Sequence, residues 1–397
     1  MLIKNIRIVD DSQDFTGDIR VEDGLISEIG TNLDGDSICL DYSRQEVFLL
    51  PAFTDLHIHF RDPGFTYKED VKTGSEAARK GGYTAVNLMP NTNPVADNME
   101  IVKDVERRVA EVGLIFANQT LSMTKGLQGQ NFDHLNELKK NEILFITDDG
   151  KGVNDDATME EIFKICKEKN ITIMAHEEDS RYSATDMRKA ENLMTFRDIV
   201  LSEKYNSPIH FCHVSTIEAI EAIEKAKVQG VPVSCEVTPH HLTATSDETN
   251  HYRVNPPFRK QADVDALIRA IQNGVVDAIA TDHAPHSAED KLNGAPGMTG
   301  LEIAFPLCYT ALVKSGHINL QTLVKLMSTQ PSNMMKLNKG KIQPGYAADF
   351  VIVELDTPFT INSNTFISKG KNTPFSGKEV CGRVLQTFRA GDVYPQN

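Results

Sequence analysis

Short apolar runs alternate with segments of helical periodicity along most of the chain. The runs are continuously apolar, which is typical of parallel strands buried on both faces. Each run is bounded by polar residues, glycine or proline, so it ends cleanly before the next segment. Eight runs are found, at residues 48–59, 84–89, 113–120, 143–147, 171–175, 209–213, 231–237 and 277–281.

The segments between these runs carry helix signals. Ser215 and Glu218 have the spacing of a capping box and open a segment that ends at Gly230. Thr158 and Glu161 open another helical segment in the same way. Eight strands that alternate with helices predict an α/β fold, a closed (β/α)8 barrel of the TIM type over residues 51–339. An open doubly wound sheet is the alternative, but no GxGxxG motif follows the first run to support it.

Both ends of the chain show a different pattern. Residues 1–50 and 340–397 alternate with a period of two, in short strands separated by Gly and Asp turns. Because the two ends share this pattern, we expect them to form one small β-sandwich domain beside the barrel.

Composition narrows the choice of partners and compartment. The 397 residues include 41 Lys plus Arg against 56 Asp plus Glu, a net charge of −15, which repels nucleic acid and anionic membranes. We therefore expect a small-molecule substrate, with neither nucleic acid nor a membrane as partner. The six cysteines form no CxxC pair and indicate reduced thiols, and no signal peptide or stretch of about 18 apolar residues is found. A cytoplasmic protein is expected.

Side chains of the types that bind metal ions lie at or just after the ends of five of the apolar runs. In a barrel, the carboxyl ends of the strands meet at one face, where active sites are built. Imidazoles and carboxylates without a thiolate suit zinc or a similar divalent ion in an open catalytic site. Six such ligands exceed one tetrahedral shell and predict a binuclear centre. The candidate ligands are His57, His59, Asp149, His176, His213 and Asp282.

Simpler explanations exist for single residues near these positions. An aspartate at a strand end often caps a helix, and His210 is explained equally well as a packed, hydrogen-bonded side chain. Asp148 is expected to cap its loop or to hydrogen-bond a histidine ligand. Arg61 continues the alternation past His59, where its guanidinium can form a bidentate contact with a substrate carboxylate.

The motifs around these residues resemble the dihydroorotase family, in its long bacterial type, of the amidohydrolase superfamily. DLHIHFRDPG at residues 55–64 is similar to that family's HxHxR-x-PG signature, and MPNTNP at residues 89–94 is similar to its MPNT-x-P. The resemblance extends over nearly the whole chain. The remaining motifs follow in the family's order: ITDDG (146–150), HEED (176–179), HVST (213–216), VNPPFR (254–259) and ATDHAPH (280–286).

The resemblance implies the reversible cyclisation of N-carbamoyl-L-aspartate to L-dihydroorotate, a step of de novo pyrimidine biosynthesis, with two Zn²⁺ ions per subunit. One zinc ion would be bound by His57, His59 and Asp282, and the other by His176 and His213. Asp149 would bridge the two ions, and Asp282 would also act as the catalytic base. The residues implied in substrate binding are His59, Arg61, Asn91, Asn255, His286, Pro296 and Gly297.

The resemblance also implies partners, and the sequence departs from the family's pattern at one segment. A homodimer is expected, and aspartate transcarbamoylase is a possible further partner. Residues 177–212 are fewer than the family leads us to expect, which puts their contribution to the pocket rim and to subunit contacts in question.

Two alternative functions remain open at this point. A hydantoinase or allantoinase would share the barrel and the metals but open a different cyclic ureide. Arg61 and Asn91 argue against this alternative, since those enzymes do not need to bind a carboxylate on the ring of their substrate. The second alternative is a catalytically silent homologue that acts as an assembly partner of aspartate transcarbamoylase, and the six filled ligand positions argue against that.

Overall fold

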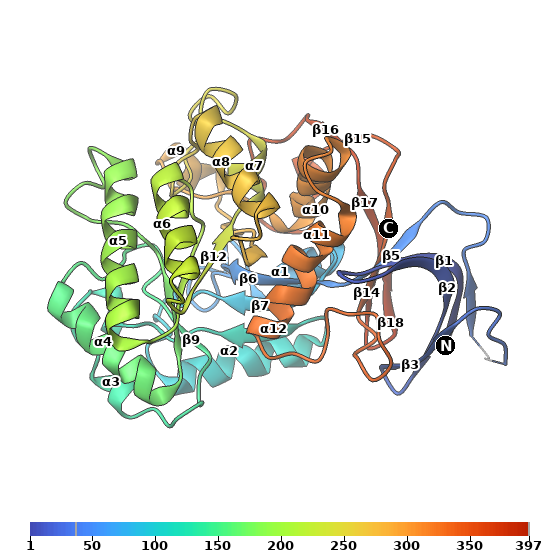
Figure 1. Cartoon of the computed structure of the whole chain (residues 1–397), viewed down its shortest axis with the longest axis horizontal. Helices are drawn as coiled ribbons and strands as arrows, with labels where there is room; N and C mark the ends of the chain where they lie inside the picture. The colour runs from blue at the N-terminus through green and yellow to red at the C-terminus, as the bar shows by residue number, and fades with distance from the viewer. Residues whose placement is uncertain (36–37, 396–397) are drawn as a thin grey trace.

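The computed structural model describes residues 1–35 and 38–395 and is built around a ring of eight parallel strands (Figure 1). β6, β7 and β8 form one sheet, and β9 to β13 pair in chain order in another. Isolated parallel bridges from Leu121 to Ile146 and from Ile58 to His283 join the two sheets into a closed barrel. The strands are β6 (Phe53–Ile58), β7 (Tyr83–Leu88), β8 (Phe116–Gln119), β9 (Phe145–Ile146), β10 (Thr172–Ala175), β11 (Ile209–Phe211), β12 (Val233–Val237) and β13 (Ala278–Ile279).

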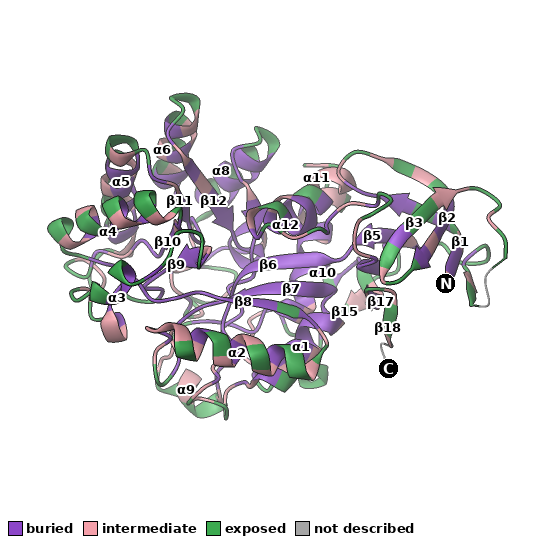
Figure 2. Ribbon diagram, turned by 90° about the horizontal axis from the view of Figure 1, so that it is seen from below, coloured by how far each residue is buried: buried purple, intermediate pink, exposed green. Residues whose placement is uncertain are grey.

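This closure confirms the predicted barrel, and the open doubly wound sheet is wrong. Helices cover the outside of the ring, with their buried faces toward the strands (Figure 2). The longer helices are α1 (Val71–Lys80), α2 (Met99–Val112), α4 (Asp156–Lys169), α5 (Met187–Tyr205), α6 (Ile217–Val228) and α8 (Gln261–Gln272). The shorter ones are α3 (Asp133–Asn136), α7 (Pro239–Thr243), α9 (Ala288–Leu292), α10 (Ala304–Cys308), α11 (Leu320–Val324) and α12 (Gln330–Met334).

Two helices begin at other residues than the sequence predicts. Thr216 rather than Ser215 is the N-cap of α6, because the Ser215 hydroxyl instead donates a hydrogen bond to the buried Glu191. Asp155 caps α4, three residues before the predicted Thr158. In both places several residues in a row have side chains able to cap, and tertiary contacts choose among them.

The first apolar run divides between the two parts of the fold. Its beginning forms β5 (Phe48–Pro51), which pairs with β1 and β14, and only its remainder enters the barrel. Strands from both chain ends thus form one sheet in the order β18-β17-β14-β5-β1-β2-β3, with β4 beside β1, as the sequence predicts. These strands are β1 (Leu2–Val9), β2 (Asp14–Glu22), β3 (Leu25–Gly30), β4 (Cys39–Asp41), β14 (Phe350–Glu354), β17 (Arg383–Arg389) and β18 (Asp392–Pro395).

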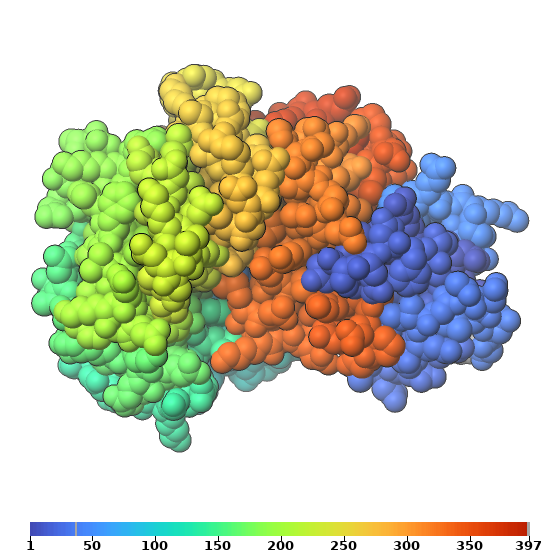
Figure 3. Space-filling model, viewed as in Figure 1, coloured from blue at the N-terminus to red at the C-terminus, as the bar shows by residue number. Residues whose placement is uncertain are grey.

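This terminal sheet has a hydrophobic core of its own, separate from that of the barrel. Figure 3 shows the blue N-terminal strands against the orange C-terminal part of the chain at one end of the molecule. We propose that residues 1–50 and 340–397 are one unit and residues 51–339 the other. The stretch between β14 and β17, with β15 (Phe359–Thr360) and β16 (Glu379–Val380), leaves the sheet and packs Phe366 and Phe375 against Val254 and Phe258 of the barrel.

The described residues include no helix that is both long and apolar enough to cross a membrane. The six cysteines are free thiols, five of them buried, in agreement with the reduced state expected from their spacing.

The first barrel strand is anchored by an aromatic cluster. Phe53 is fully buried, with ring centroids 5.5 Å from Tyr83 and 5.0 Å from Phe305. Tyr83 begins β7, whereas Phe305 lies in α10, so the cluster ties two neighbouring strands to a late helix.

We predict that Phe53→Ala lowers the free energy of unfolding by about 3–5 kcal/mol, because it removes buried aromatic surface and leaves a cavity. Phe116→Ala is the control, since Phe116 is 42% exposed and should change the same quantity by less than about 1 kcal/mol. Equilibrium urea denaturation measures both. Equal effects of the two substitutions would show that the cluster does not anchor the strand.

Candidate metal centre and substrate cavity

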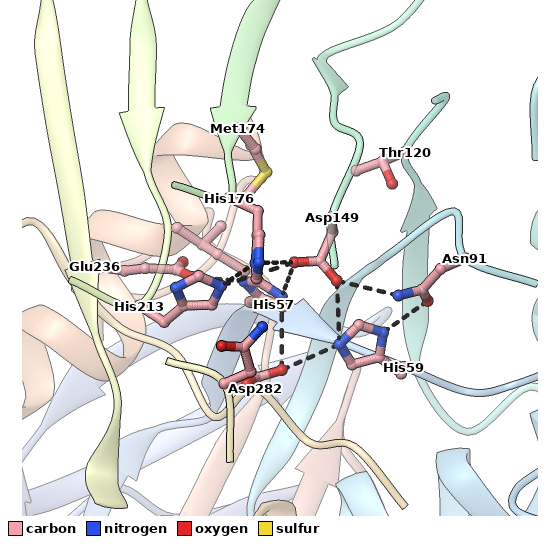
Figure 4. Close-up of polar contacts among 12 residues, drawn as sticks. His57, His59, Asn91, Thr120, Asp149, Met174, His176, His213, Glu236 and Asp282 are labelled. Atoms are coloured by element: carbon pink, nitrogen blue, oxygen red, sulfur yellow. Dashed lines mark hydrogen bonds and ion pairs between the residues drawn. The ribbon is translucent and has the colours of Figure 1, made fainter. Parts of the chain in front are cut away.

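The six predicted ligands meet at the carboxyl-terminal end of the barrel, although they come from five different strands (Figure 4). His57 belongs to β6 and His59 follows it, while the other four lie just beyond β9, β10, β11 and β13. All six are buried. Barrel closure therefore brings together side chains that are up to 225 positions apart in the sequence, from His57 to Asp282.

Asp149 lies at the centre of this cluster. Its Oδ1 is 3.2 Å from His57 Nε2, 3.3 Å from His176 Nδ1 and 3.8 Å from His213 Nε2. Its Oδ2 is 3.5 Å from His59 Nε2. The two carboxylate oxygens thus face different imidazoles, which is the arrangement that a bridging ligand requires.

Asp282 completes the other side of the cluster. Its Oδ1 is 3.0 Å from His59 Nε2 and 3.7 Å from His57 Nε2. The ligand atoms of His57, His59 and Asp282 lie within 4.8 Å of one another, as do those of His57, Asp149 and His213. His176 Nδ1 and His213 Nε2 are 2.9 Å apart.

These donor atoms fit divalent cations. His57 Nε2 is buried and has no hydrogen-bond partner among the described residues, although it faces two carboxylates. A buried nitrogen without a partner is costly unless something binds it. Imidazole nitrogens and carboxylate oxygens are the donor set of open zinc sites.

Acceptors behind the imidazoles fix which nitrogen faces the cluster. His57 Nδ1 donates to Glu236 Oε1 at 2.8 Å, His59 Nδ1 donates to Asn91 Oδ1 at 2.8 Å, and His176 Nε2 donates to Glu178 Oε2 at 3.0 Å. In each ring the second nitrogen therefore points at the carboxylates, where it binds a metal ion once its proton has left.

Sequence reasoning did not find Glu236 or Glu178. A carboxylate inside the apolar run 231–237 is the signal that points to Glu236. Its second oxygen lies 3.1 Å from His210 Nε2, so His210 is indeed a packed and hydrogen-bonded side chain. Asp148 accepts hydrogen bonds from the backbone and hydroxyl of Thr124, so its side chain ties its own loop to the loop after β8 and does not cap its own loop.

The electrostatics of the cluster favour positive charge. Burial raises the pKa of Asp149, but the charge of His57 and hydrogen bonds from His176 and His213 outweigh it and hold this pKa well below its usual value. The pKa of Asp282 is also lowered. Burial raises it, but the hydrogen bond with His59 and the charge of His57 outweigh that effect. Burial disfavours the charged form of His176, yet Asp149 and Glu178 raise its pKa to about 10. Both carboxylates remain ionised at neutral pH.

Three site residues adopt left-handed backbone conformations. The φ angles are +58° at Arg61, +35° at His213 and +46° at Asp282. Each such residue costs about 1–3 kcal/mol unless it is glycine, and strain of this kind clusters at functional sites. Here it turns the three side chains toward the cavity.

A cavity of about 180 Å³ lies directly above the cluster. The six further residues that the sequence assigns to substrate binding all line it, together with His59 and four more of the candidate ligands. These six are Arg61, Asn91, Asn255, His286, Pro296 and Gly297.

The contacts of these residues differ from one another. The Nε atom of Arg61 is buried and has no hydrogen-bond partner among the described residues. Asn91 is engaged by the ligand cluster, because its amide nitrogen donates to Asp149 Oδ2 at 3.1 Å and its oxygen accepts from His59. Asn255 donates to Glu178 Oε2 at 2.7 Å.

His286 is held from two sides of the cavity rim. Its Nε2 lies 2.9 Å from the carbonyl oxygen of Pro296, and its backbone nitrogen donates to Asn372 Oδ1 at 2.9 Å. Burial and the nearby charges of Arg61 and Lys68 lower the pKa of His286 to about 3, so its ring is neutral at physiological pH. Asn372 and Lys68 were not found from the sequence. Asn372 belongs to the C-terminal stretch that packs on the barrel.

Comparison with known proteins identifies the family of the chain. A model of the amidohydrolase family matches residues 48–394. The chain is 48% identical to a dihydroorotase of Clostridium botulinum over 99% of this chain and 98% of that one. It is 39% identical to a dihydroorotase of Acetivibrio thermocellus, again over 99% and 98% of the two chains.

Solved structures show the same fold at lower sequence identity. The L-hydantoinase (dihydropyrimidinase) of Arthrobacter aurescens superposes with a TM-score of 0.87 at 24% identity, over 100% of this chain and 96% of that one. The dihydropyrimidinase of Brevibacillus agri gives 0.88 at 23% identity, over 100% and 95%. At these identities the likeness concerns the fold alone. The family model and the long, closely related sequences decide the family: the chain belongs to the amidohydrolase family and, within it, to the dihydroorotases.

Proposed function

We propose that the protein is a metal-dependent dihydroorotase, which reversibly cyclises N-carbamoyl-L-aspartate to L-dihydroorotate with loss of water, in the cytoplasm and for pyrimidine biosynthesis. The observation that carries the proposal is the Arg61 guanidinium, which lines the cavity with an unpartnered, buried Nε beside a cluster of metal-type ligands. A cation in this position calls for an anionic group on the substrate. Dihydroorotate combines a ring amide with such a carboxylate.

The residues of the cluster would hold two zinc ions. His57, His59 and Asp282 would bind one, His176 and His213 the other, and Asp149 both, in keeping with its two oxygens facing different imidazoles. When bound by these residues, two zinc ions would lower the pKa of a water molecule toward neutrality and would polarise the carbonyl oxygen of the substrate.

Asp282 is the proposed proton carrier. Its low pKa keeps it ionised, so in ring opening it accepts the proton of the attacking water and passes that proton to the ring nitrogen as the amide bond breaks. In cyclisation it takes the proton from the ureido nitrogen and returns it to the departing water.

Arg61 and Asn255 orient the substrate. Arg61 pairs with the ring carboxylate, which places the amide carbonyl over the ligand cluster. Glu178 is an acceptor, with a pKa lowered to about 2 because hydrogen bonding and the charge of His176 outweigh burial, so Asn255 must present its amide nitrogen to Glu178. The oxygen of Asn255 is then left as an acceptor for a ring N–H. The same carboxylate positions His176 and thereby couples substrate contact to the ligand cluster.

The alternatives are separated by one assay. Purified, zinc-supplemented protein is incubated with L-dihydroorotate, with N-carbamoyl-L-aspartate and with hydantoin, and the absorbance of the ring amide is followed. Interconversion of the first two supports the proposal. Faster opening of hydantoin would favour a hydantoinase, and no turnover of any ring would favour a silent assembly partner of aspartate transcarbamoylase.

The protein as purified without chelator should contain about two divalent ions per chain, as two-metal hydrolases require. Asp149→Ala should lower that number, because it removes a carboxylate that faces His57 and His59 as well as His176 and His213. Lys151→Ala is the matched control, since Lys151 is exposed two residues later and its loss should leave the metal content unchanged. Elemental analysis measures the ions. Metal retained in Asp149→Ala but lost in Lys151→Ala would reverse the assignment.

Asp282→Asn should lower turnover at saturating substrate by about 10²–10⁴-fold, because the amide keeps the shape but accepts no proton. Metal content is measured alongside, so that turnover is compared per bound ion. Turnover close to that of the wild type would exclude Asp282 as the base.

Arg61→Met should lower kcat/KM for dihydroorotate by about ten- to a hundredfold, since a charge-assisted contact is worth about 1.5–3 kcal/mol. Arg107→Met on the exposed side of α2 is the control and should leave kcat/KM unchanged. Opening of hydantoin, which has no carboxylate, should be almost unaffected in both variants. If Arg61→Met slows both rings equally, its role is structural.

A further inference from the structure

His286 stands in the cavity wall between two groups that set its hydrogen bonding. Its Nδ1 lies 3.4 Å from the ammonium group of Lys68, and its Nε2 lies 2.9 Å from the carbonyl oxygen of Pro296. An ammonium group only donates hydrogen bonds, and a carbonyl oxygen only accepts them. The neutral ring of His286 therefore accepts from Lys68 at Nδ1 and carries its proton on Nε2.

The carbonyl group of Pro296 is fixed by its neighbours in the loop. Lys291 Nζ donates to the carbonyl oxygen of Ala295 at 2.7 Å and to that of Gly297 at 2.9 Å. The loop is thus held on both sides of Pro296. Both nitrogens of His286 meet partners that select the same tautomer.

The protonated Nε2 lies beside a second donor. Arg61 Nη2 is 3.4 Å away, and two donors cannot hydrogen-bond to each other. Arg61 and His286 both line the cavity, and Nε of Arg61 has no partner among the described residues. Two donors this close together suit the two oxygens of a carboxylate.

Lys68 stands behind this wall. It is not one of the residues that line the cavity, and its side chain is 15% exposed. Its Nζ is 3.3 Å from Asp290 Oδ1, while the other oxygen of Asp290 accepts hydrogen bonds from the backbone and hydroxyl of Ser287. Asp290 thus holds the ammonium group in place, and Lys68 reaches the cavity only through His286.

The position of Asp290 shows what the ammonium group prevents. Asp290 Oδ2 lies 4.0 Å from Nδ1 of His286. Without Lys68, this carboxylate would attract a proton onto Nδ1. Nε2 would then turn an unprotonated nitrogen toward the substrate carboxylate, and two acceptors repel each other.

We propose that Lys68 is a positioning residue for substrate binding, which holds the proton of His286 on Nε2 so that this nitrogen and Arg61 donate together to the substrate carboxylate. The inference rests on the proposed function, because only a ring that bears a carboxylate uses both donors. The simpler interpretation is structural: the ion pair between Lys68 and Asp290 ties the loop after β6 to α9. The two interpretations differ in whether the effect of Lys68 passes through His286.

Steady-state kinetics of the zinc-supplemented protein with L-dihydroorotate test this role. Lys68→Met should raise KM by about tenfold and change kcat by less than about twofold, because a contact to the carboxylate weakens while the ligand cluster is unchanged. Lys164→Met is the matched control, since Lys164 pairs with Glu161 on the exposed side of α4 at 2.6 Å and its loss should leave both constants unchanged. A fall in kcat with an unchanged KM overturns the proposal.

A double-mutant cycle separates the two interpretations. In a His286→Ala background, Lys68→Met should raise KM by less than about twofold, because a lysine that acts through the ring has no effect once the ring is gone. Lys68→Arg should keep KM within about threefold of the wild type, since a guanidinium group also only donates. An undiminished effect of Lys68→Met without the ring shows that the ion pair acts by itself and overturns the proposal.

The tautomer is measured directly by two-bond ¹H–¹⁵N correlation spectra of protein labelled with ¹⁵N-histidine, in which His286 is identified by its absence from His286→Ala. In the wild type the ring should carry its proton on Nε2, and in Lys68→Met the proton should lie partly on Nδ1. This measurement needs no turnover, so it tests Lys68 even if the protein does not act on dihydroorotate. The same tautomer in both proteins, or a proton on Nδ1 in the wild type, contradicts the role of Lys68.

Discussion

Two ionised carboxylates buried in the mouth of the barrel are the constraint on which the rest of the site depends. Asp149 and Asp282 lie out of water, where an unpaired charge costs several kcal/mol. Four imidazoles surround them, and three of these rings are in turn positioned by Glu236, Asn91 and Glu178. Positive charge stabilises these carboxylates, and divalent cations held by the four imidazole nitrogens and the two aspartates would supply it.

The cavity above the cluster has a polarity that follows from this arrangement. Its lower side is negative, while Arg61 supplies a cation at the rim. A substrate that carries both a polarisable carbonyl and a carboxylate satisfies both ends, and a neutral ring satisfies only one. Asn372 of the C-terminal stretch holds His286 of this rim, 86 positions earlier in the chain, so the terminal unit takes part in shaping the cavity.

The sequence by itself determined the alternation of eight buried strands with helices, the pairing of the two chain ends and the six ligand candidates. A strand that is buried on both faces needs apolar side chains throughout, so each strand is visible in the local sequence. Because the barrel closes, the carboxyl ends of its strands meet at one face, and residues at those ends become neighbours. Local capping chemistry was less decisive: Ser215 and Thr216 are both able to cap α6, and only the contact of Ser215 with Glu191 selects between them.

Tertiary structure alone decided which groups stand behind the ligands and behind the cavity wall. Glu236 meets His57 across 179 positions, and no periodicity encodes such a pairing. Asn91 lines the cavity and also donates a hydrogen bond to Asp149 of the ligand cluster, and its sequence motif did not indicate this second contact. Lys68 meets His286 across 218 positions, and only the packing of its loop beside α9 brings the two together. The physical reason is common to all three: side-chain type is local, whereas burial and partnership depend on contacts between distant parts of the chain.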